Sequence, residues 1–212
     1  FLATEDAYSK GINISLTRIV RYFAFLVTLL TPAVYIALTT YNQEMLPNQL
    51  LISFASQRST VPFPAFFEAI IMMASFEILR ECDLRLPTFT TSALSIVGAL
   101  ILGEAAVNAG IVSPIMIIVI AITAVAALLF TEPEIINGVR WYRLLFMIGA
   151  NFLGIFGVVI VFILFITRLA SLDSFGLPFL YPLSPMDTAG LKNSIIKFPT
   201  KDLNKRQKAL SR

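Results

Sequence analysis

The sequence predicts an all-α integral membrane protein with about four transmembrane helices and one amphipathic helix that is interfacial or re-entrant. Composition is the first reason: 57% of the 212 residues are hydrophobic and 14% are charged, whereas an ordinary soluble domain has about 25% charged residues. The mean hydropathy of +0.82 agrees with this. The second reason is that apolar runs long enough to cross a hydrocarbon core of about 30 Å alternate with short polar connections.

Four apolar runs are the predicted spans, at residues 19–41, 93–109, 115–130 and 144–167. The second and third are separated only by residues 110–114, so we expect a tight antiparallel hairpin of two helices near the lower length limit. The fourth run is the most uniformly apolar, with Asn151 as its strongly polar interior residue. Within it, Ala150, Gly154 and Gly157 form a ridge of small residues, which predicts close helix packing and self-association.

Residues 62–87, PFPAFFEAIIMMASFEILRECDLRLP, contain the predicted amphipathic helix, from Ala65 to Cys82. At 100° per residue this helix has two faces. One face holds Ile70, Met73, Glu77, Arg80 and Glu81, and the other holds Glu68, Met72, Ser75 and Leu79. Carboxylates on opposite faces cannot both point into lipid, because ionised groups at bilayer depth are costly. We therefore expect an interfacial helix, a re-entrant helix or a pore helix.

The charges divide the chain into three predicted regions. Residues 1–18 are a cytoplasmic or interfacial lead-in, residues 19–185 are the membrane domain, and residues 186–212 are a basic cytoplasmic tail. Lys and Arg mark the cytoplasmic side, so basic residues at both ends predict an even number of spans. Four spans satisfy this rule if residues 62–82 do not cross. Because the sequence starts FLATED without an initiator Met, we expect a piece of a longer protein.

Several kinds of chemistry lack the residues that they need. The sequence has no histidine, which excludes histidine-based triads and metal ligands, and one cysteine, which excludes an internal disulfide. It also has no Gly-rich phosphate loop, nucleophile elbow or paired-cysteine metal spacing. We therefore expect no enzyme activity, no cofactor or metal site and no nucleic-acid partner. We expect the chain to lie in the lipid bilayer.

Glu68 is the first candidate for an ion pathway. It begins a helix after the segment VPFP and has Phe66, Phe67 and Ile71 as neighbours. The helix macrodipole favours an ionised carboxylate at this position by up to about 1 kcal/mol. A ring of such carboxylates from several subunits would attract cations to the mouth of a pore. The alternative is a structural residue that caps the helix.

Three further acids and one amide are candidates for the same pathway. Glu77 and Glu81 are four residues apart and share a helix face, where Arg80 can compensate their repulsion. The alternative for this pair is a solvated face with a local ion pair. Glu104 and Asn108 are also four apart in a predicted span, and an acid inside a span predicts a functional site. The alternative there is an interfacial acid.

Three stretches together resemble the A-type subunit of bacterial spore germinant receptors, the GerA family. They are LTPAVYIALTTYNQEMLPNQLLISFASQRSTVPFPAFFEA (30–69), FEILRECDLRLP with SALSIVGALILGEAAVNAGIVSP (76–114), and RLASLDSFGLPFLYPLSP (168–185). The resemblance implies a multi-pass protein of the spore inner membrane, preceded by a soluble domain. It also implies a homo-oligomeric ring, a pentamer, that conducts cations when a nutrient is sensed. The implied partners are a transporter-like B subunit, which holds the germinant, and a lipoprotein C subunit.

Other functions remain open from the sequence alone. The chain also fits a paralogue of the sporulation-operon type, which resembles the A subunit but works with a related membrane partner. A second class of function is a non-conducting membrane scaffold that docks a transporter-like partner. A secondary transporter subunit is the weakest alternative, because no inverted repeat is visible and four spans are few.

Overall fold

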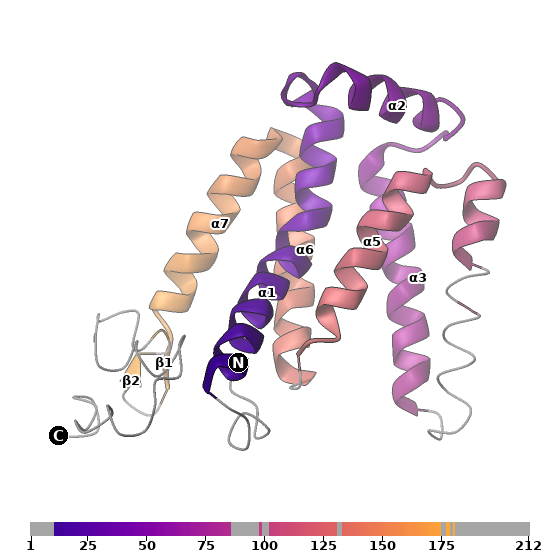
Figure 1. The fold of residues 1–212 in the computed structure, drawn as a ribbon. Coiled ribbons are helices and arrows are strands. Elements are labelled where there is room, and N and C mark those ends of the chain that lie inside the picture. The colour runs from indigo at the N-terminus through magenta and orange to yellow at the C-terminus, as the bar shows by residue number, and fades with distance from the viewer. Residues whose placement is uncertain are drawn as a thin grey trace.

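A computed structural model describes residues 11–85, 98, 102–130, 133–174, 177–178 and 180 of the chain (Figure 1). Its helices are α1 (Gly11–Thr40), the 3-10 helix η2 (Gln43–Met45), α2 (Asn48–Arg58), α3 (Ala65–Arg85), α5 (Pro114–Ala127), α6 (Pro133–Leu153) and α7 (Ile155–Ala170). Residues 102–108 are also helical. The two-residue strands β1 (Asp173–Ser174) and β2 (Leu177–Pro178) pair antiparallel. Apart from this small pair, the predicted all-α fold is confirmed for the described residues.

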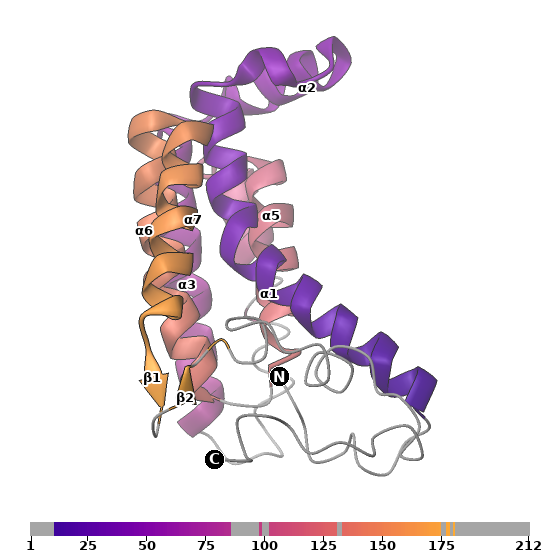
Figure 2. The same ribbon diagram turned by 90° about the vertical axis from the view of Figure 1, so that its left-hand side faces the viewer.

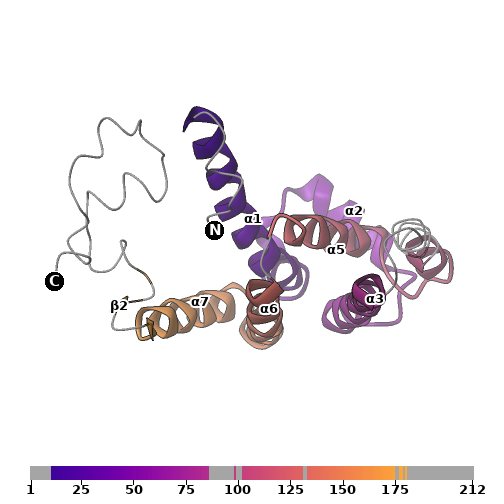
Figure 3. The ribbon, with the colours of Figure 1, turned by 90° about the horizontal axis from the view of Figure 1, so that it is seen from below.

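The helices form a bundle around α1, which packs against α5, α6 and α7. Seen along the bundle, α7 lies on one side of α6, and α5 and α3 lie on the other (Figure 3). Helix α2 lies across one end of the bundle (Figures 1 and 2). We call this the α2 end.

Helix α1 is longer than the predicted span at residues 19–41. It is helical from Gly11, within the predicted lead-in. Of the described helices, its segment Ile14–Thr40 is the one long and apolar enough to cross a membrane, and α5 and α7 are shorter apolar helices. Polar side chains are accommodated by local bonds: the Thr28 hydroxyl donates to the carbonyl of Ala24 at 2.8 Å, as Thr often does in apolar helices.

The two faces predicted for α3 are wrong. Its buried side chains include Ala65, Glu68, Ala69, Met72 and Met73, which form one stripe at helical spacing. The prediction had put Met72 and Met73 on opposite faces. The stripe packs on α5 and α1, so Glu68 lies on the same buried face as the methionines.

The orientation of α3 disagrees with the interfacial helix, one of the three predicted alternatives, and does not test the re-entrant helix or the pore helix. The helix begins at Ala65, as predicted, and ends at Arg85 rather than Cys82. It lies alongside α5 (Figures 1 and 3), which is the orientation of a bundle helix and not of an interfacial one. Among the described helices, α2 has the orientation expected of an interfacial helix.

The predicted span at residues 144–167 is not a single helix. Helix α6 ends at Leu153, Gly154 adopts φ +62° and ψ −140°, and α7 begins at Ile155 and returns beside α6 (Figure 1). Residues other than glycine rarely adopt this φ, and a Cβ at Gly154 would lie 2.5 Å from Asn42 Oδ1. That oxygen accepts a hydrogen bond from the Ile155 N–H at 3.1 Å, which satisfies a free donor at the start of α7.

Helices α6 and α7 form an antiparallel pair with closely packed backbones. The facing pairs are Gly149 with Gly157, Phe146 with Phe162, and Tyr142 with Phe165. A Cβ at Gly157 would lie 1.9 Å from the carbonyl oxygen of Gly149, so no larger residue fits. The close packing predicted at Gly157 is therefore found within one chain, and Gly154 is a turn residue, not part of a packing ridge.

The predicted hairpin is confirmed in its described part. Gly110 has φ +66°, and α5 starts at Pro114, where the missing N–H of proline costs nothing. A Cβ at Gly103 would lie 3.7 Å from the Ile117 side chain, so residues 102–108 pack back on α5. Most of the predicted span 93–109 lies outside the described residues. The same holds for all of residues 1–10 and of the tail 186–212.

The bundle has an apolar core and an apolar exterior. Fully buried core side chains include Leu29, Ile36, Met116, Phe146 and Met147. Large apolar side chains are also exposed on the outside, such as Leu128 (79% exposed) and Phe156 (76% exposed). Extensive exposed apolar surface of this kind marks an interaction with a membrane or another protein.

Candidate functional site

Glu68 lies at the centre of a buried polar cluster at the α2 end. Its side chain is 0% exposed. The backbone N–H of Ser113 donates to Glu68 Oε2 at 3.0 Å, and the Ser113 hydroxyl donates to the same oxygen at 2.8 Å. Arg58 Nη2 lies 3.5 Å from Glu68 Oε1. A carboxylate removed from water needs such partners to remain charged.

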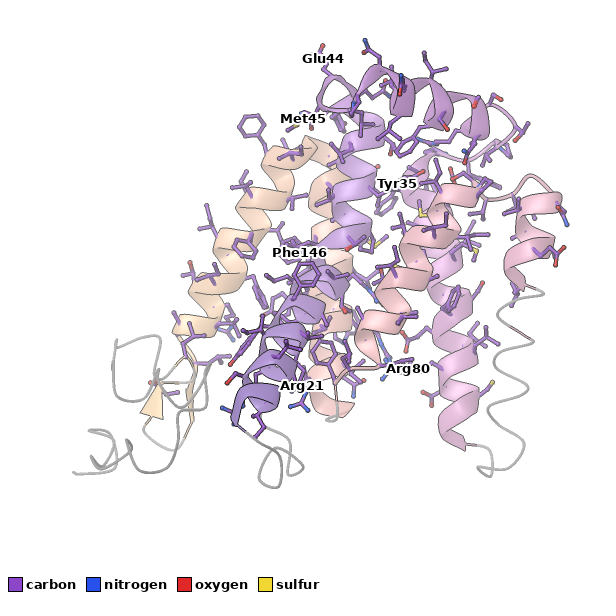
Figure 4. All side chains as sticks on the ribbon, viewed as in Figure 1. Arg21, Tyr35, Glu44, Met45, Arg80 and Phe146 are labelled. Carbon is purple, nitrogen blue, oxygen red and sulfur yellow. The ribbon has the colours of Figure 1, made fainter. Side chains whose placement is uncertain are left out.

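The Tyr35 hydroxyl completes the cluster, which we call the Glu68 site: Tyr35, Arg58, Glu68 and Ser113. Tyr35 Oη lies 3.4 Å from Ser113 Oγ. A hydroxyl has one proton to donate, and Ser113 donates its proton to Glu68, so Tyr35 is the donor to Ser113. Figure 4 shows Tyr35 on α1. The site therefore joins α1, α2, α3 and the turn before α5.

Local sequence explains why Glu68 comes to this position. The segment Pro62–Phe63–Pro64 precedes α3, and the Glu68 N–H already bonds the Pro64 carbonyl at 3.1 Å. Glu68 is thus in the first turn of α3, where the helix dipole favours an anion. Ser113 directly precedes α5, so the N-termini of two helices face one carboxylate.

A second ion-pair cluster joins α3 to α6. Glu77 Oε1 contacts Arg140 Nη2, and Glu77 Oε2 lies 4.0 Å from Arg143 Nη2. These side chains are partly buried. We call these three residues the Glu77 cluster. Basic residues of α6 neutralise Glu77 of α3, so this acid faces protein.

The Glu77 cluster borders a groove of about 600 Å³ between α3, α5 and α6, and Thr28 of α1 also lines it. Most of its wall is apolar, including Met73, Phe76, Ile117, Ile120, Ala124 and Val139. Arg80 lines the same groove. Among the described residues, no group of three or more His, Cys, Asp and Glu side chains could hold a metal ion.

The sequence profile of the Bacillus/Clostridium GerA spore germination proteins matches residues 1–209. This chain belongs to the GerA family. It is 44% identical over 214 residues to spore germination protein KA of Bacillus subtilis, and 35% identical over 210 residues to spore germination protein GerLA of Bacillus cereus. It is also 39% identical over 210 residues to the uncharacterized membrane protein YfkQ of Bacillus subtilis.

The alignment with KA covers 100% of this GerA chain and 39% of KA. The alignment with GerLA covers 99% of this chain and 43% of GerLA, and the alignment with YfkQ covers 99% of this chain and 41% of YfkQ. The chain thus spans about two fifths of the length of the curated relatives it matches. No solved structure matches. The stretches that carry the GerA resemblance also build the Glu68 site, since Tyr35, Arg58 and Glu68 lie in 30–69 and Ser113 lies in 76–114.

The structure does not gather the predicted pathway residues of this GerA chain into one site. Glu68 and Glu77 are nine residues apart on α3, about 14 Å along the helix, and belong to separate clusters. Glu81 is exposed beyond the Glu77 cluster. Glu104 and Asn108 are exposed on the helix at residues 102–108. Their role in an ion pathway stays a prediction.

Sequence reasoning missed the partners of both acids. These are Tyr35, Arg58 and Ser113 for Glu68, and Arg140 and Arg143 for Glu77. One signal was available: a carboxylate at the start of an apolar helix requires a cation or several donors. The sequence offers Arg58 ten residues before Glu68, across the turn that links α2 to α3.

Proposed function

We propose that this GerA chain is the multi-pass membrane part of a spore germinant-receptor subunit. In this proposal, subunits form a ring in the spore inner membrane and conduct cations when a partner senses nutrient. The family supports a role in spore germination. The apolar exterior of the bundle supports insertion in a membrane. A pentameric ring, a transporter-like B subunit and a lipoprotein C subunit remain proposals that rest on the GerA resemblance.

The arginines give the bundle an orientation in this proposal. Arg18, Arg21, Arg80, Arg140 and Arg168 lie toward the end opposite α2, Arg143 lies near the middle of α6, and Arg58 is at the α2 end. Figure 4 labels Arg21 and Arg80 toward one end, and Glu44 and Met45 at the other. Cytoplasmic segments carry more Lys and Arg, so we assign the end opposite α2 to the cytoplasm.

One observation carries the proposed ion pathway. Glu104 and Asn108 are exposed next to one another on the outside of an apolar bundle, whereas Glu68 and Glu77 are engaged by partners within the chain. An exposed acid at membrane depth is costly unless it meets water, an ion or a partner. We propose that Glu104 and Asn108 face a cation path between subunits, and that Glu68 is structural.

A non-conducting scaffold is the second candidate. It is favoured by the use of both Glu68 and Glu77 inside the chain, which leaves fewer acids for a pore. In a scaffold, Glu104 and Asn108 would contact a transporter-like partner instead of ions. The same exposed pair therefore separates the two functions.

Cation flux through the reconstituted protein distinguishes these functions. The full-length protein would be purified in detergent, its oligomeric mass measured, and the oligomer placed in liposomes loaded with potassium. We expect potassium release that Glu104→Gln lowers. The matched control is Glu44→Gln, which removes an exposed acid of η2 and should leave release unchanged. Because conduction in this proposal needs the nutrient-sensing partner, potassium release would also be measured from germinating spores that carry the same variants. An intact oligomer without release that depends on Glu104 in either assay would contradict the channel and favour the scaffold.

A further inference from the structure

The groove between α3, α5 and α6 has the features of a site for an amphiphile. Its volume of about 600 Å³ is within the range of small-molecule sites, about 300–1,000 Å³. The wall is mostly apolar, and small side chains on α5, Ala121 and Ala124, leave room along it. The groove is partly open, so an occupant could enter from the side of the bundle.

Positive charge is concentrated beside this groove. Arg80, Arg140 and Arg143 line it, and Glu77 is the carboxylate that lines it with them. Three positive charges and one negative charge leave a formal net charge of +2 among these lining residues. Neither the Arg140 Nε nor the Arg143 Nε, both buried, has a hydrogen-bond partner among the described residues. Each guanidinium has five N–H donors, more than one carboxylate can satisfy.

The position of the arginines along the bundle indicates which end of an amphiphile they would meet. Arg80 and Arg140 lie toward the end opposite α2, which the proposed function assigns to the cytoplasm. The apolar wall extends from there toward the α2 end, past Met73 and Ile117. An amphiphile would fit this arrangement with its charged headgroup at the cytoplasmic surface of the membrane, near the arginines, and its acyl chain along the apolar wall. Basic pockets between helices on this side of a membrane bind anionic lipid headgroups.

We propose that the groove holds an acyl chain of an anionic phospholipid from the inner leaflet, with its phosphate on Arg80 and Arg140. Glu77 contacts Arg140 and lies 4.0 Å from Arg143, so the two arginines of α6 together offset this carboxylate, and Arg140 keeps further N–H donors for the phosphate. A phosphate matches guanidinium groups because it can accept paired N–H bonds. The proposal depends on the proposed insertion of the bundle in a membrane, but not on cation conduction.

A photoreactive lipid tests occupancy of the groove. Full-length protein in lipid nanodiscs would be irradiated with a phosphatidylglycerol that carries a diazirine on one acyl chain, and labelled residues would be mapped by mass spectrometry. We expect labels on α3 between Met73 and Arg80 and on the facing residues of α5. Ala124→Phe should fill the groove and remove these labels. Its control, Ile118→Phe, enlarges an exposed residue of α5 outside the groove and should retain them.

The headgroup part of the proposal has its own test. The same labelling with a phosphatidylcholine probe should be weaker, and Arg80→Gln should reduce the preference for phosphatidylglycerol by roughly fivefold, the effect expected of one basic residue near anionic lipid. Arg168→Gln removes an exposed arginine at the same end and should not. Equal labelling by both lipids would overturn the proposal. Lipid labels that lie only on exposed residues outside the groove would also overturn it.

Potassium flux in the same preparations separates this proposal from the proposed function. Lipid labels in the groove, without potassium release in liposomes or in germinating spores, would support the lipid site and contradict the channel. Flux without groove labels would support the channel and contradict the lipid site.

Discussion

Ser113 donates two hydrogen bonds to one carboxylate oxygen of Glu68, a residue 45 positions earlier in the chain. The bonds connect the start of α3 to the start of α5, and Arg58 brings α2 to the other oxygen. Because the carboxylate is fully buried, these contacts replace its water and fix the α2 end of the bundle. These contacts support the proposed structural role of Glu68, which the sequence left as the alternative to a pore residue.

Loss of the Glu68 charge should destabilise the protein. Hydrogen bonds to charged groups contribute about 1.5–3 kcal/mol, so we expect Glu68→Gln to lower the stability by about that amount and Ser113→Ala to lower it less. Thermal unfolding of the full-length protein in detergent measures this. Glu44→Gln, at an exposed acid, should unfold like the wild type. A stable Glu68→Gln protein with reduced cation flux would instead restore the pore role.

Gly154 should tolerate no side chain. Its φ of +62° with ψ of −140° costs residues other than glycine about 1–3 kcal/mol, and a Cβ would collide with Asn42. We expect Gly154→Ala to destabilise the protein by at least that amount, as measured by thermal unfolding. Gly138 lies in α6 with open space around its Cβ position, so Gly138→Ala should be neutral or stabilise by up to about 1 kcal/mol. Equal changes in stability for Gly154→Ala and Gly138→Ala would argue against a turn at Gly154.

Glu77 and Arg140 should be energetically coupled. Contacting charged residues show interaction energies of about 0.5–3 kcal/mol in double-mutant cycles, and the partial exposure of this pair favours the lower part of that range. We expect about 1 kcal/mol between Glu77→Gln and Arg140→Gln in thermal unfolding experiments. The same cycle with Arg168→Gln should be additive, since Arg168 is exposed on α7. Coupling no larger than in that control would mean that the ion pair contributes nothing.

The all-α class and the hairpin at residues 110–114 could be predicted from the sequence because both depend on local patterns. Apolar runs predict helices, and Gly110 followed by Pro114 marks a turn between two of them. The break at Gly154 could not be predicted this way. A glycine in an apolar run is typical of helix packing, and here the turn depends on Asn42, which is more than a hundred residues away.

The partners of the α3 charges could not be predicted from the sequence. The rule that ionised groups avoid the bilayer holds for unpaired charges, and it predicted that residues 62–82 do not cross. In the structure, Glu68 is paired with Arg58, and Glu77 with Arg140. Such pairing depends on tertiary contacts that the sequence does not reveal.

The central claim is that α3 crosses the membrane within the bundle, and two cysteines test it most directly. Cys82 is exposed near the end of α3, and Ser59 is exposed in the turn between α2 and α3. The full-length protein, with any other cysteines replaced, would carry either Cys82 alone or Ser59→Cys with Cys82 replaced. Oriented vesicles would be treated with an impermeant maleimide. We expect Cys82 to react from the cytoplasmic side and the cysteine at position 59 from the opposite side. Reaction of both from the same side would contradict the account.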